Sequence, residues 1–215
     1  MGSTRLPGKV LRPVGHLPLL GHVLGRLSQA SHRVDVVVAT SVLSQDDAIA
    51  SYCETNQVRC YRGSEMDVLD RFYQCARRFT FEQIVRLTAD NPFTDIEELD
   101  RLIDLHLHDA NAFTHSFGKL PVGVGAEIFS FEALERSWRE GTEPHHREHV
   151  DEYLLEHPEV FKTGALDIPA RKINSNLRLT VDTEADWQLA DGLARQAGGA
   201  WLTTDRIIEL CSLSA

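Results

Sequence analysis

The stretch that decides the expected fold lies at residues 1–9, which read Met1-Gly2-Ser3-Thr4-Arg5-Leu6-Pro7-Gly8-Lys9. Glycines let the backbone turn sharply and approach a ligand closely, and the hydroxyl residues add hydrogen-bond donors. Arg5 and Lys9 supply two cations, and Pro7 stiffens the loop between them. This combination favours a loop that wraps a triphosphate in backbone amides. A basic and disordered chain terminus is the simpler interpretation of such a stretch.

The composition is that of an ordinary globular protein with an acidic balance. The chain has 215 residues, of which 42% are hydrophobic, and a formal net charge of −10, which disfavours binding to nucleic-acid phosphates. We expect no secretory signal, and no apolar run in this sequence approaches the ~20 residues that span a bilayer. The four cysteines lack paired metal spacing. We therefore expect reduced thiols, a cytoplasmic location and no membrane insertion.

Expected strands and helices alternate through the first half of the chain. Strands are expected at residues 35–40, 58–61 and 83–87, and helices at 18–30, 46–55 with Ser44 as N-cap, 66–79 and 96–108. In the second half we expect strands at 126–129, 161–166 and 177–181, and helices at 131–140 capped by Ser130, 144–157, 183–196 and 203–210. This order predicts an α/β fold, a three-layer α/β/α sandwich with a mostly parallel, Rossmann-like sheet.

Two aspartates each follow an expected strand. Asp90 comes after residues 83–87, and Asp182 comes after residues 177–181. Open α/β sheets bind ligands beyond the carboxyl ends of their strands, and carboxylate oxygens are the ligands that Mg²⁺ prefers. The alternative interpretation is that each aspartate only caps the turn or helix that follows it.

Two further clusters have both a structural and a functional interpretation. Ser64 and Asp67 have the spacing of a capping box at a helix start, next to the cation of Arg71. His145 and His149 fall four residues apart, as zinc ligands on a helix do, but no glutamate occupies the position that a metalloprotease helix needs between them.

Three separated segments, in this order, resemble a known family. The loop at 2–9, the segment at 86–92 (with Ala89 where the family commonly has glycine) and the segment at 181–186 are similar to motifs of sugar nucleotidyltransferases. The likeness is to the cytidylyltransferases that activate acidic sugars and to the related spore-coat-polysaccharide type. It runs from Gly2 to about Ile208 and implies one nucleotidyltransferase domain over 1–215, with a nucleotide-binding half at 1–110 and an acceptor-binding half at 111–215.

The resemblance also implies an activity and its residues. The enzyme would join CTP to an anionic sugar or sugar-like acceptor, with release of pyrophosphate, for surface glycan synthesis, and a homodimer is expected. Arg5 and Lys9 would act on the triphosphate, and Asp90 and Asp182 would hold Mg²⁺. The remaining nucleotide-binding residues would be Gly2, Ser3, Thr4, Ser64, Asp67 and Arg71, and the acceptor-binding residues would be Glu127, Arg147, Glu148 and His149.

One feature departs from the resemblance. In the family an apolar strand in the middle of the sheet precedes the phosphate loop, whereas here the loop starts at Gly2. Either the real start lies upstream, or the chain lacks a central strand of its sheet. For a chain that starts at Met1 we expect poor stability, or a gap filled by another segment or subunit, and weak or absent cytidylyl transfer. Two alternatives follow: a relative that binds a nucleotide or partner without turnover, and a nucleotide-sugar-dependent glycosyltransferase. The latter would need an Asp-x-Asp motif, which residues 90–92 do not provide.

Overall fold

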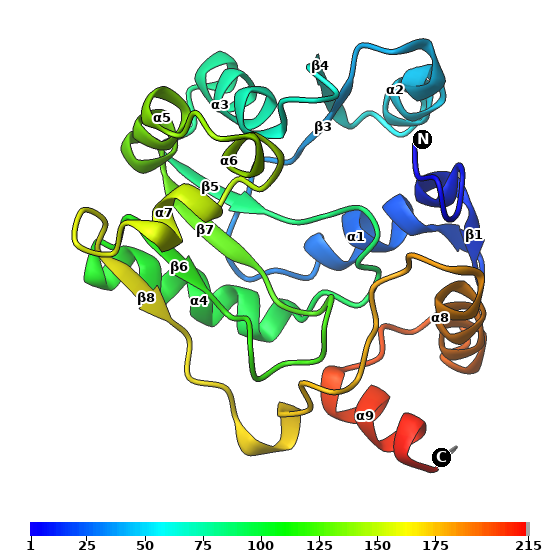
Figure 1. Cartoon of the computed structure of the whole chain (residues 1–215). Coiled ribbons are helices and arrows are strands. Elements are labelled where there is room, and N and C mark those ends of the chain that lie inside the picture. The colour runs from blue at the N-terminus through cyan, green and yellow to red at the C-terminus, as the bar shows by residue number, and fades with distance from the viewer. Residues whose placement is uncertain (214–215) are drawn as a thin grey trace.

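Strands and helices alternate along the computed structural model of the chain, which describes residues 1–213 (Figure 1). Its first half contains η1 (Lys9–Leu11), β1 (Pro13–Val14), β2 (Leu17–Pro18), α1 (Leu19–Leu27), β3 (Val37–Ser41), η2 (Ser44–Asp46), α2 (Asp47–Thr55), β4 (Arg59–Gly63), α3 (Val68–Phe79), β5 (Gln83–Arg86) and α4 (Ile96–Asp109). Its second half contains β6 (Phe113–His115), β7 (Glu127–Ser130), α5 (Phe131–Glu140), α6 (Pro144–Glu148), α7 (Glu152–Glu156), β8 (Thr163–Ala165), η3 (Ala170–Lys172), α8 (Glu184–Gln196) and α9 (Thr204–Leu213).

The main strands form two separate sheets. β3 and β4 pair in parallel, from Val37 opposite Arg59 to Ser41 opposite Gly63. The other sheet has the order β5-β7-β6-β8, in which β7 is antiparallel to both neighbours and β6 is parallel to β8. The α/β class is confirmed, and this larger sheet is mixed in direction because β6 and β7 are consecutive strands that pair side by side.

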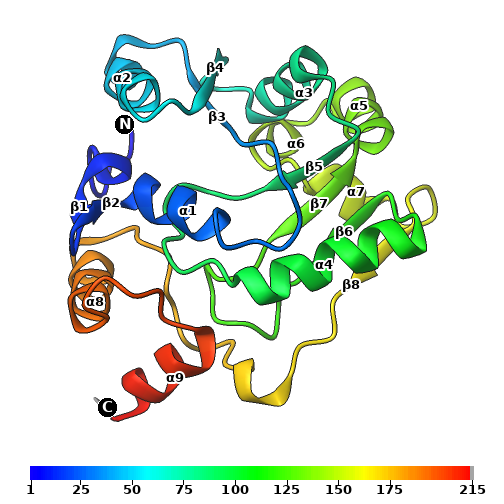
Figure 2. The same cartoon turned by 180° about the vertical axis from the view of Figure 1, so that it is seen from behind.

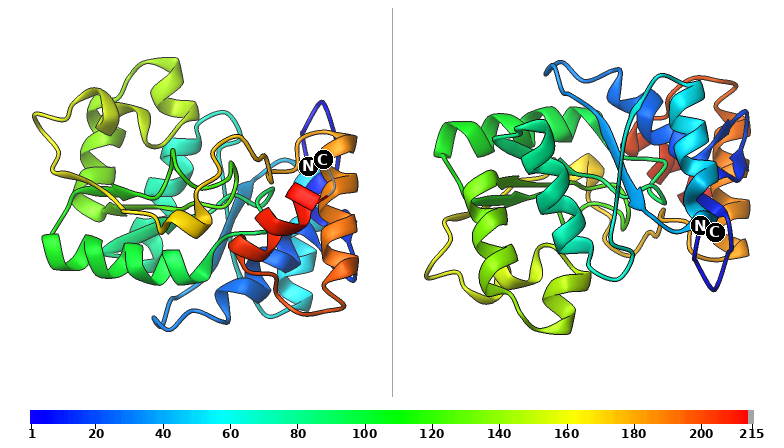
Figure 3. Two further views of the ribbon diagram at one scale, coloured as in Figure 1. Left: turned by 90° about the horizontal axis from the view of Figure 1, so that it is seen from below. Right: turned by 90° about the horizontal axis from the view of Figure 1, so that it is seen from above.

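Helices cover both faces of the larger sheet, which gives the three layers that the sequence predicts. Adjacent residues of β7 point to opposite faces, as the pleat requires. Ile128 packs in a core with Leu99 and Leu102 of α4, and Phe129 packs in a second core with Leu69 of α3 and Leu134 of α5. Figure 3 shows α4 on one side of the sheet and α5 on the other. Figure 2 shows α1 on the same side as α4.

Several expected elements differ from the observed ones. Ser44 lies in η2, and Asp46 is the N-cap position of α2, so the expected serine cap is wrong. The expected helix over 144–157 is broken into α6 and α7 because the backbone of His149 is extended. Residues 177–181 form no strand among the described residues. Instead, Arg178 makes an isolated parallel bridge to Val122. The Ser130 cap of α5 is confirmed, since its side chain accepts a bond from the Ala133 amide.

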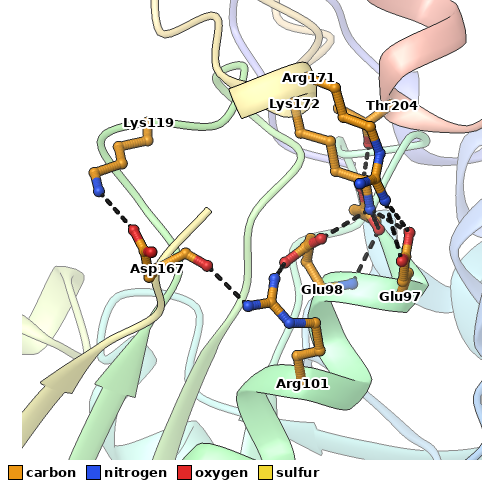
Figure 4. Close-up of polar contacts among 9 residues, drawn as sticks. Glu97, Glu98, Arg101, Lys119, Asp167, Arg171, Lys172 and Thr204 are labelled. Carbon is orange, nitrogen blue, oxygen red and sulfur yellow. Dashed lines mark hydrogen bonds and ion pairs between the residues drawn. The ribbon is translucent and has the colours of Figure 1, made fainter. Parts of the chain in front are cut away.

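A buried charge cluster ties the C-terminal segments to the start of α4 (Figure 4). Lys172 is only 1% exposed, and its Nζ lies 2.7 Å from Glu97 Oε2 and 2.9 Å from Glu98 Oε1. Asp95 lies 2.9 Å from the same ammonium and also accepts a bond of 2.6 Å from the hydroxyl of Thr204 in α9. A buried cation needs such partners, so the cluster fixes η3 and α9 against α4.

Candidate functional site

The ammonium of Lys9 joins the two aspartates that the sequence singles out. Lys9 Nζ lies 2.8 Å from Asp90 Oδ2, 2.8 Å from Asp182 Oδ1 and 2.9 Å from the carbonyl oxygen of Val181. Lys9 is 8% exposed, so this contact is made largely out of water. The fold therefore brings the loop, the segment after β5 and the segment before α8 to one point.

Local backbone geometry explains why these three residues meet. Gly8 has φ +73°, a value that favours glycine, and it turns the chain into η1, which begins at Lys9. The amide of Val181 donates a bond of 2.9 Å to the Asp90 carbonyl oxygen. Thr183 and Asp186 form the capping box of α8, and Asp186 also accepts a bond of 3.0 Å from the Asp182 amide. Main-chain contacts thus hold both aspartates in place.

Cations surround Asp182. Arg5 NH2 lies 3.2 Å from Asp182 Oδ1, and Arg178 pairs with Oδ2. Burial acts to raise the pKa of Asp182, but the hydrogen bond from Lys9 and the fields of Lys9, Arg5 and Arg178 outweigh it and lower that pKa. The carboxylate is therefore ionised at neutral pH, as a metal or a cationic side chain requires.

The donor atoms at this point fit a hard divalent cation. Two carboxylate oxygens and one carbonyl oxygen already converge on a cation, the Lys9 ammonium, and Mg²⁺ takes oxygen ligands of these kinds. Asn91, the next residue after Asp90, has a buried side-chain oxygen, Oδ1, without a hydrogen-bond partner among the described residues. The residues present therefore suit Mg²⁺ at this position, provided that Lys9 moves aside.

Two other clusters of possible ligands lie away from this point. Asp95, Glu97 and Glu98 converge, but Lys172 already occupies their centre. His145 and His146 meet at Glu156. The Nδ1 of His146 accepts a bond from the Glu143 amide, so its Nε2 carries the proton and donates to Glu156 at 2.8 Å. A metal at that Nε2 would require the opposite tautomer. This disfavours zinc, and His149 lies outside the cluster.

Ser64, Asp67 and Arg71, which are expected to bind the nucleotide, lie together around the turn that leads into α3. Ser64 Oγ accepts a bond of 3.0 Å from the Asp67 amide, and Asp67 is itself the N-cap of α3, bonded to the Asp70 amide. The expected capping box with Ser64 as cap is therefore wrong, because α3 begins later, at Val68. Arg71 NH1 donates to the Ser64 carbonyl oxygen at 2.6 Å, while its buried Nε has no partner among the described residues.

The expected acceptor residues fall into two places. Glu127 is 1% exposed and forms an ion pair with Arg86, its cross-strand neighbour in β5. Burial raises the pKa of Glu127 to about 7, against the opposing effect of Arg86. Arg147 lies 3.5 Å from Asp67 Oδ2 and so joins the turn before α3. Its neighbours Glu148 and His149 are exposed.

The loop residues that precede Lys9 lie largely at the surface. Ser3 Oγ accepts a bond of 3.2 Å from the Leu6 amide, and Thr4 and Arg5 are exposed. A Cβ built on Gly2 would lie only 2.9 Å from Gln45 Nε2 and 3.1 Å from Glu65 Oε1. Gly2 is therefore packed against the side chains that precede α2 and α3, and any larger residue there would force them to shift.

Sequence reasoning missed three residues that complete these groups. Arg178 lies in the expected strand at 177–181, but only the fold shows that it pairs with Asp182. The pairing of Arg86 with Glu127 follows from the register of β5 on β7, which the sequence alone does not give. Gly123 has φ +91°, and a Cβ there would lie 2.6 Å from the Thr180 amide nitrogen and 2.9 Å from Asn91 Oδ1. Its positive φ and lack of a side chain let the segments around Asp90 and Asp182 pack together.

The chain is similar to known proteins over most of its length. A family model described as cytidylyltransferase matches residues 1–195. The chain is 39% identical over 189 residues to an uncharacterised protein of Methanocaldococcus jannaschii, covering 87% of this chain and 77% of that protein. It is 37% identical over 203 residues to the spore coat polysaccharide biosynthesis protein SpsF of Bacillus subtilis, covering 92% of this chain and 84% of SpsF.

A solved structure shares the fold over nearly the whole chain. The structure of a cytidylyltransferase from Leptospira borgpetersenii superposes with a TM-score of 0.86 and 32% identity, and the match covers 99% of this chain and 89% of that one. No helix in the described part of the chain has the length and apolar character needed to cross a membrane.

Proposed function

Because the chain belongs to the cytidylyltransferase family, we propose that it transfers the cytidylyl group of CTP to an anionic sugar or sugar-like acceptor for polysaccharide synthesis. The convergence of Asp90 and Asp182 on the Lys9 ammonium is the observation that carries the proposal. We place the enzyme in the cytoplasm, consistent with its four free cysteines.

In the proposed reaction an acceptor oxygen attacks the α-phosphorus of CTP in line. The bond from that phosphorus to the oxygen bridging to the β-phosphate breaks, and pyrophosphate leaves with the electron pair. Asp90 and Asp182 would hold Mg²⁺, which when bound neutralises charge on the phosphate oxygens. Lys9 leaves the two carboxylates and binds the triphosphate. The exposed Arg5 neutralises the triphosphate from its other side.

Residues around this centre bind the two substrates. Gly2, Ser3 and Thr4 offer backbone and hydroxyl donors to the phosphates, and the turn formed by Ser64, Asp67 and Arg71 binds the nucleoside end. The acceptor is bound by Glu127, whose buried Oε2 has no partner among the described residues, and by the segment Arg147, Glu148 and His149. A cation lies at each of the two places, Arg86 beside Glu127 and Arg147 beside Asp67, and both favour an anionic acceptor.

Pyrophosphate release tests the proposal. The chain is assayed with Mg²⁺, with each of the four nucleoside triphosphates, and with matched pairs of sugars that differ only in a carboxylate. We expect release with CTP and an acidic sugar and little with the neutral partner. Release with another triphosphate but not CTP would contradict the nucleotide assignment, and release with only neutral sugars would contradict the acceptor class.

Thermal melting separates binding from turnover. A ligand that binds only the folded state raises apparent stability by mass action. We expect CTP and Mg²⁺ together to raise the melting midpoint more than the sum of their separate effects, because the metal bridges the two carboxylates and the triphosphate. No shift at millimolar concentrations of both would contradict an intact nucleotide site.

A further inference from the structure

Arg178 contacts the carboxylate of Asp182 through the oxygen that Lys9 does not contact. Oδ1 of Asp182 lies 2.8 Å from Lys9 Nζ and 3.2 Å from Arg5 NH2, whereas Arg178 pairs with Oδ2. The two oxygens of one carboxylate are therefore divided between two sets of cations. Because Lys9 also contacts Asp90, Oδ1 is the oxygen of Asp182 that shares a cation with the second carboxylate.

Main-chain contacts fix the position from which the Arg178 side chain extends. Arg178 forms a parallel bridge with Val122. The Val122 amide donates a bond of 2.8 Å to the Leu177 carbonyl oxygen, and the Leu179 amide donates one of 2.8 Å to the Val122 carbonyl oxygen. Leu179 is also buried in the larger core. The backbone of Arg178 is thus held by its neighbours on both sides.

A bend of the backbone at Thr180 brings Arg178 back to Asp182. Four residues of extended chain span about 13 Å, so a straight segment would carry the two side chains apart. Gly123 packs at this bend, since a Cβ on it would lie 2.6 Å from the Thr180 amide nitrogen. The contact between Arg178 and Asp182 therefore depends on how the segment folds against Gly123, unlike a pair at the same spacing on a helix.

Asp186 holds the same region from the start of α8. Its Oδ2 accepts bonds of 3.0 Å from the Asp182 amide and 2.8 Å from the Thr183 amide, and its Oδ1 lies 3.9 Å from Arg178 Nε. Arg178 thus lies between the side chains of Asp182 and Asp186. A guanidinium presents its donors in a rigid planar fork, so a guanidinium next to both carboxylates favours one orientation of Asp182.

We propose that Arg178 is a positioning residue for the metal, because its contact with Oδ2 holds the Asp182 carboxylate with Oδ1 toward Asp90. The inference rests on the proposed function, in which Asp90 and Asp182 hold Mg²⁺. A hydrogen-bonded partner of a metal-binding side chain orients that side chain, and its loss typically lowers metal affinity about 10- to 100-fold. Arg178 has the place of such a partner, whereas Lys9 fills the place of the metal itself.

Charge and orientation predict opposite effects for the loss of Arg178. A cation repels a nearby metal ion, so the removal of the Arg178 charge alone would strengthen metal binding. If Arg178 orients Asp182, its removal lets the carboxylate turn, and metal binding weakens in spite of the lost repulsion. Lys9→Met removes a cation from the other oxygen of the same carboxylate and should strengthen metal binding. The sign of the change in affinity therefore separates the two roles.

The test titrates Mn²⁺ into the nucleotide-free chain in a calorimeter. We expect Arg178→Met to bind Mn²⁺ at least tenfold more weakly, both in the otherwise unchanged chain and together with Lys9→Met, where the ammonium no longer competes. Arg206→Met, which breaks an exposed ion pair with Glu209, is the matched control and should leave the affinity unchanged. Equal or tighter binding by Arg178→Met would overturn the proposal. Failure of both the unchanged chain and Lys9→Met to bind Mn²⁺ would contradict the proposed metal site itself.

The Mg²⁺ dependence of pyrophosphate release gives a second readout. With CTP and an acidic sugar, we expect Arg178→Met to raise the KM for Mg²⁺ at least tenfold and to keep kcat at saturating Mg²⁺ within threefold, because excess metal compensates for weaker binding. A lower kcat with an unchanged KM for Mg²⁺ would also overturn the proposal, since Arg178 would then act on a substrate. The melting midpoint checks that each variant is folded, and Arg178→Ala replaces Arg178→Met if the latter is not.

Discussion

The Lys9 ammonium lies 2.8 Å from Asp182 Oδ1 and at the same distance from Asp90 Oδ2, so one cation neutralises both carboxylates. Two carboxylates this close repel each other unless a positive charge lies between them. Lys9 therefore fills the place where a metal would stabilise the same pair. In the proposed reaction, Lys9 leaves the two carboxylates for the incoming triphosphate as the metal binds between them, so that one cation replaces another.

The first prediction concerns this exchange. Lys9→Met removes the resident cation, so Mn²⁺ should bind the nucleotide-free protein at least tenfold more tightly, while kcat/KM for CTP should fall at least 100-fold through loss of charge on the triphosphate. Calorimetric titration and pyrophosphate release measure the two effects. Lys119→Met, which breaks an exposed ion pair with Asp167, is the control. Unchanged metal affinity in the Lys9 variant would show that Lys9 does not compete with metal.

Asp90→Asn tests the metal-binding carboxylate. The amide keeps the size of the side chain and loses the charge that binds metal, so the melting midpoint should change little while kcat falls at least 100-fold. Asp104→Asn removes an exposed carboxylate paired with His32 and should leave both unchanged. If Asp90→Asn retains near-normal pyrophosphate release, Asp90 is only a turn residue.

Glu127 should make stability depend on pH. Its pKa of about 7 in the folded state is above its value of about 4.3 in an unfolded chain. The folded state thus holds the proton more tightly, and this contribution is complete below about pH 4 and is lost as the pH rises through 7. The loss should be on the order of 3–4 kcal/mol. Urea unfolding of Glu127→Gln should lack it, and the exposed Glu132→Gln should keep it. An identical pH profile in Glu127→Gln would refute the assignment.

Lys172 should be a main support of the C-terminal segments. Lys172→Met leaves Asp95 and Glu98 buried without their cation, which should lower the free energy of unfolding by about 3–5 kcal/mol. The neighbouring Arg171→Met removes an exposed partner of Glu97 and should cost less than about 1 kcal/mol. Guanidinium unfolding compares the two, and equal losses would mean that burial of Lys172 does not matter.

Gly123 should be needed for close packing near the site. Gly123→Ala places a Cβ 2.6 Å from the Thr180 amide nitrogen, whereas Gly118→Ala, at a similar φ of +90°, meets nothing within 4 Å. Both variants carry the strain of a positive φ, so their difference isolates the contact. We expect a tenfold or larger loss of kcat only in Gly123→Ala. Equal activity in the two would show that the contact with Thr180 relaxes without cost.

The sequence predicted the parts of the fold that depend on local pattern. The helix at 131–140 and its Ser130 cap are confirmed. They could be predicted because the helical spacing of apolar residues and the capping residue both lie within one short stretch of sequence. The strand β6 was missed because it has only three residues, too few to show a period. The pairing of Arg86 with Glu127 could not be predicted either, because it depends on the register between two strands that are far apart in the sequence.

The family resemblance and the expected strand ends predicted that Asp90 and Asp182 meet, and the structure brings both to the Lys9 ammonium. The strand expected at 177–181 from its alternating pattern is wrong, because a single bridge to Val122 replaces it. The segment is held there by its contact with Gly123 and by the bond to the Asp90 carbonyl oxygen. These are contacts with other parts of the chain, which no local hydrophobic pattern records.

Lys9 and Asp182 are separated by 173 residues along the chain, and this distance has a consequence for synthesis on the ribosome. Contacts of such large sequence separation form late, because the intervening loop must first be closed. The nascent chain would carry the Lys9 loop and Asp90 long before Asp182 emerges. If these residues act as proposed, nucleotide turnover begins only once nearly the whole described chain has been translated and folded.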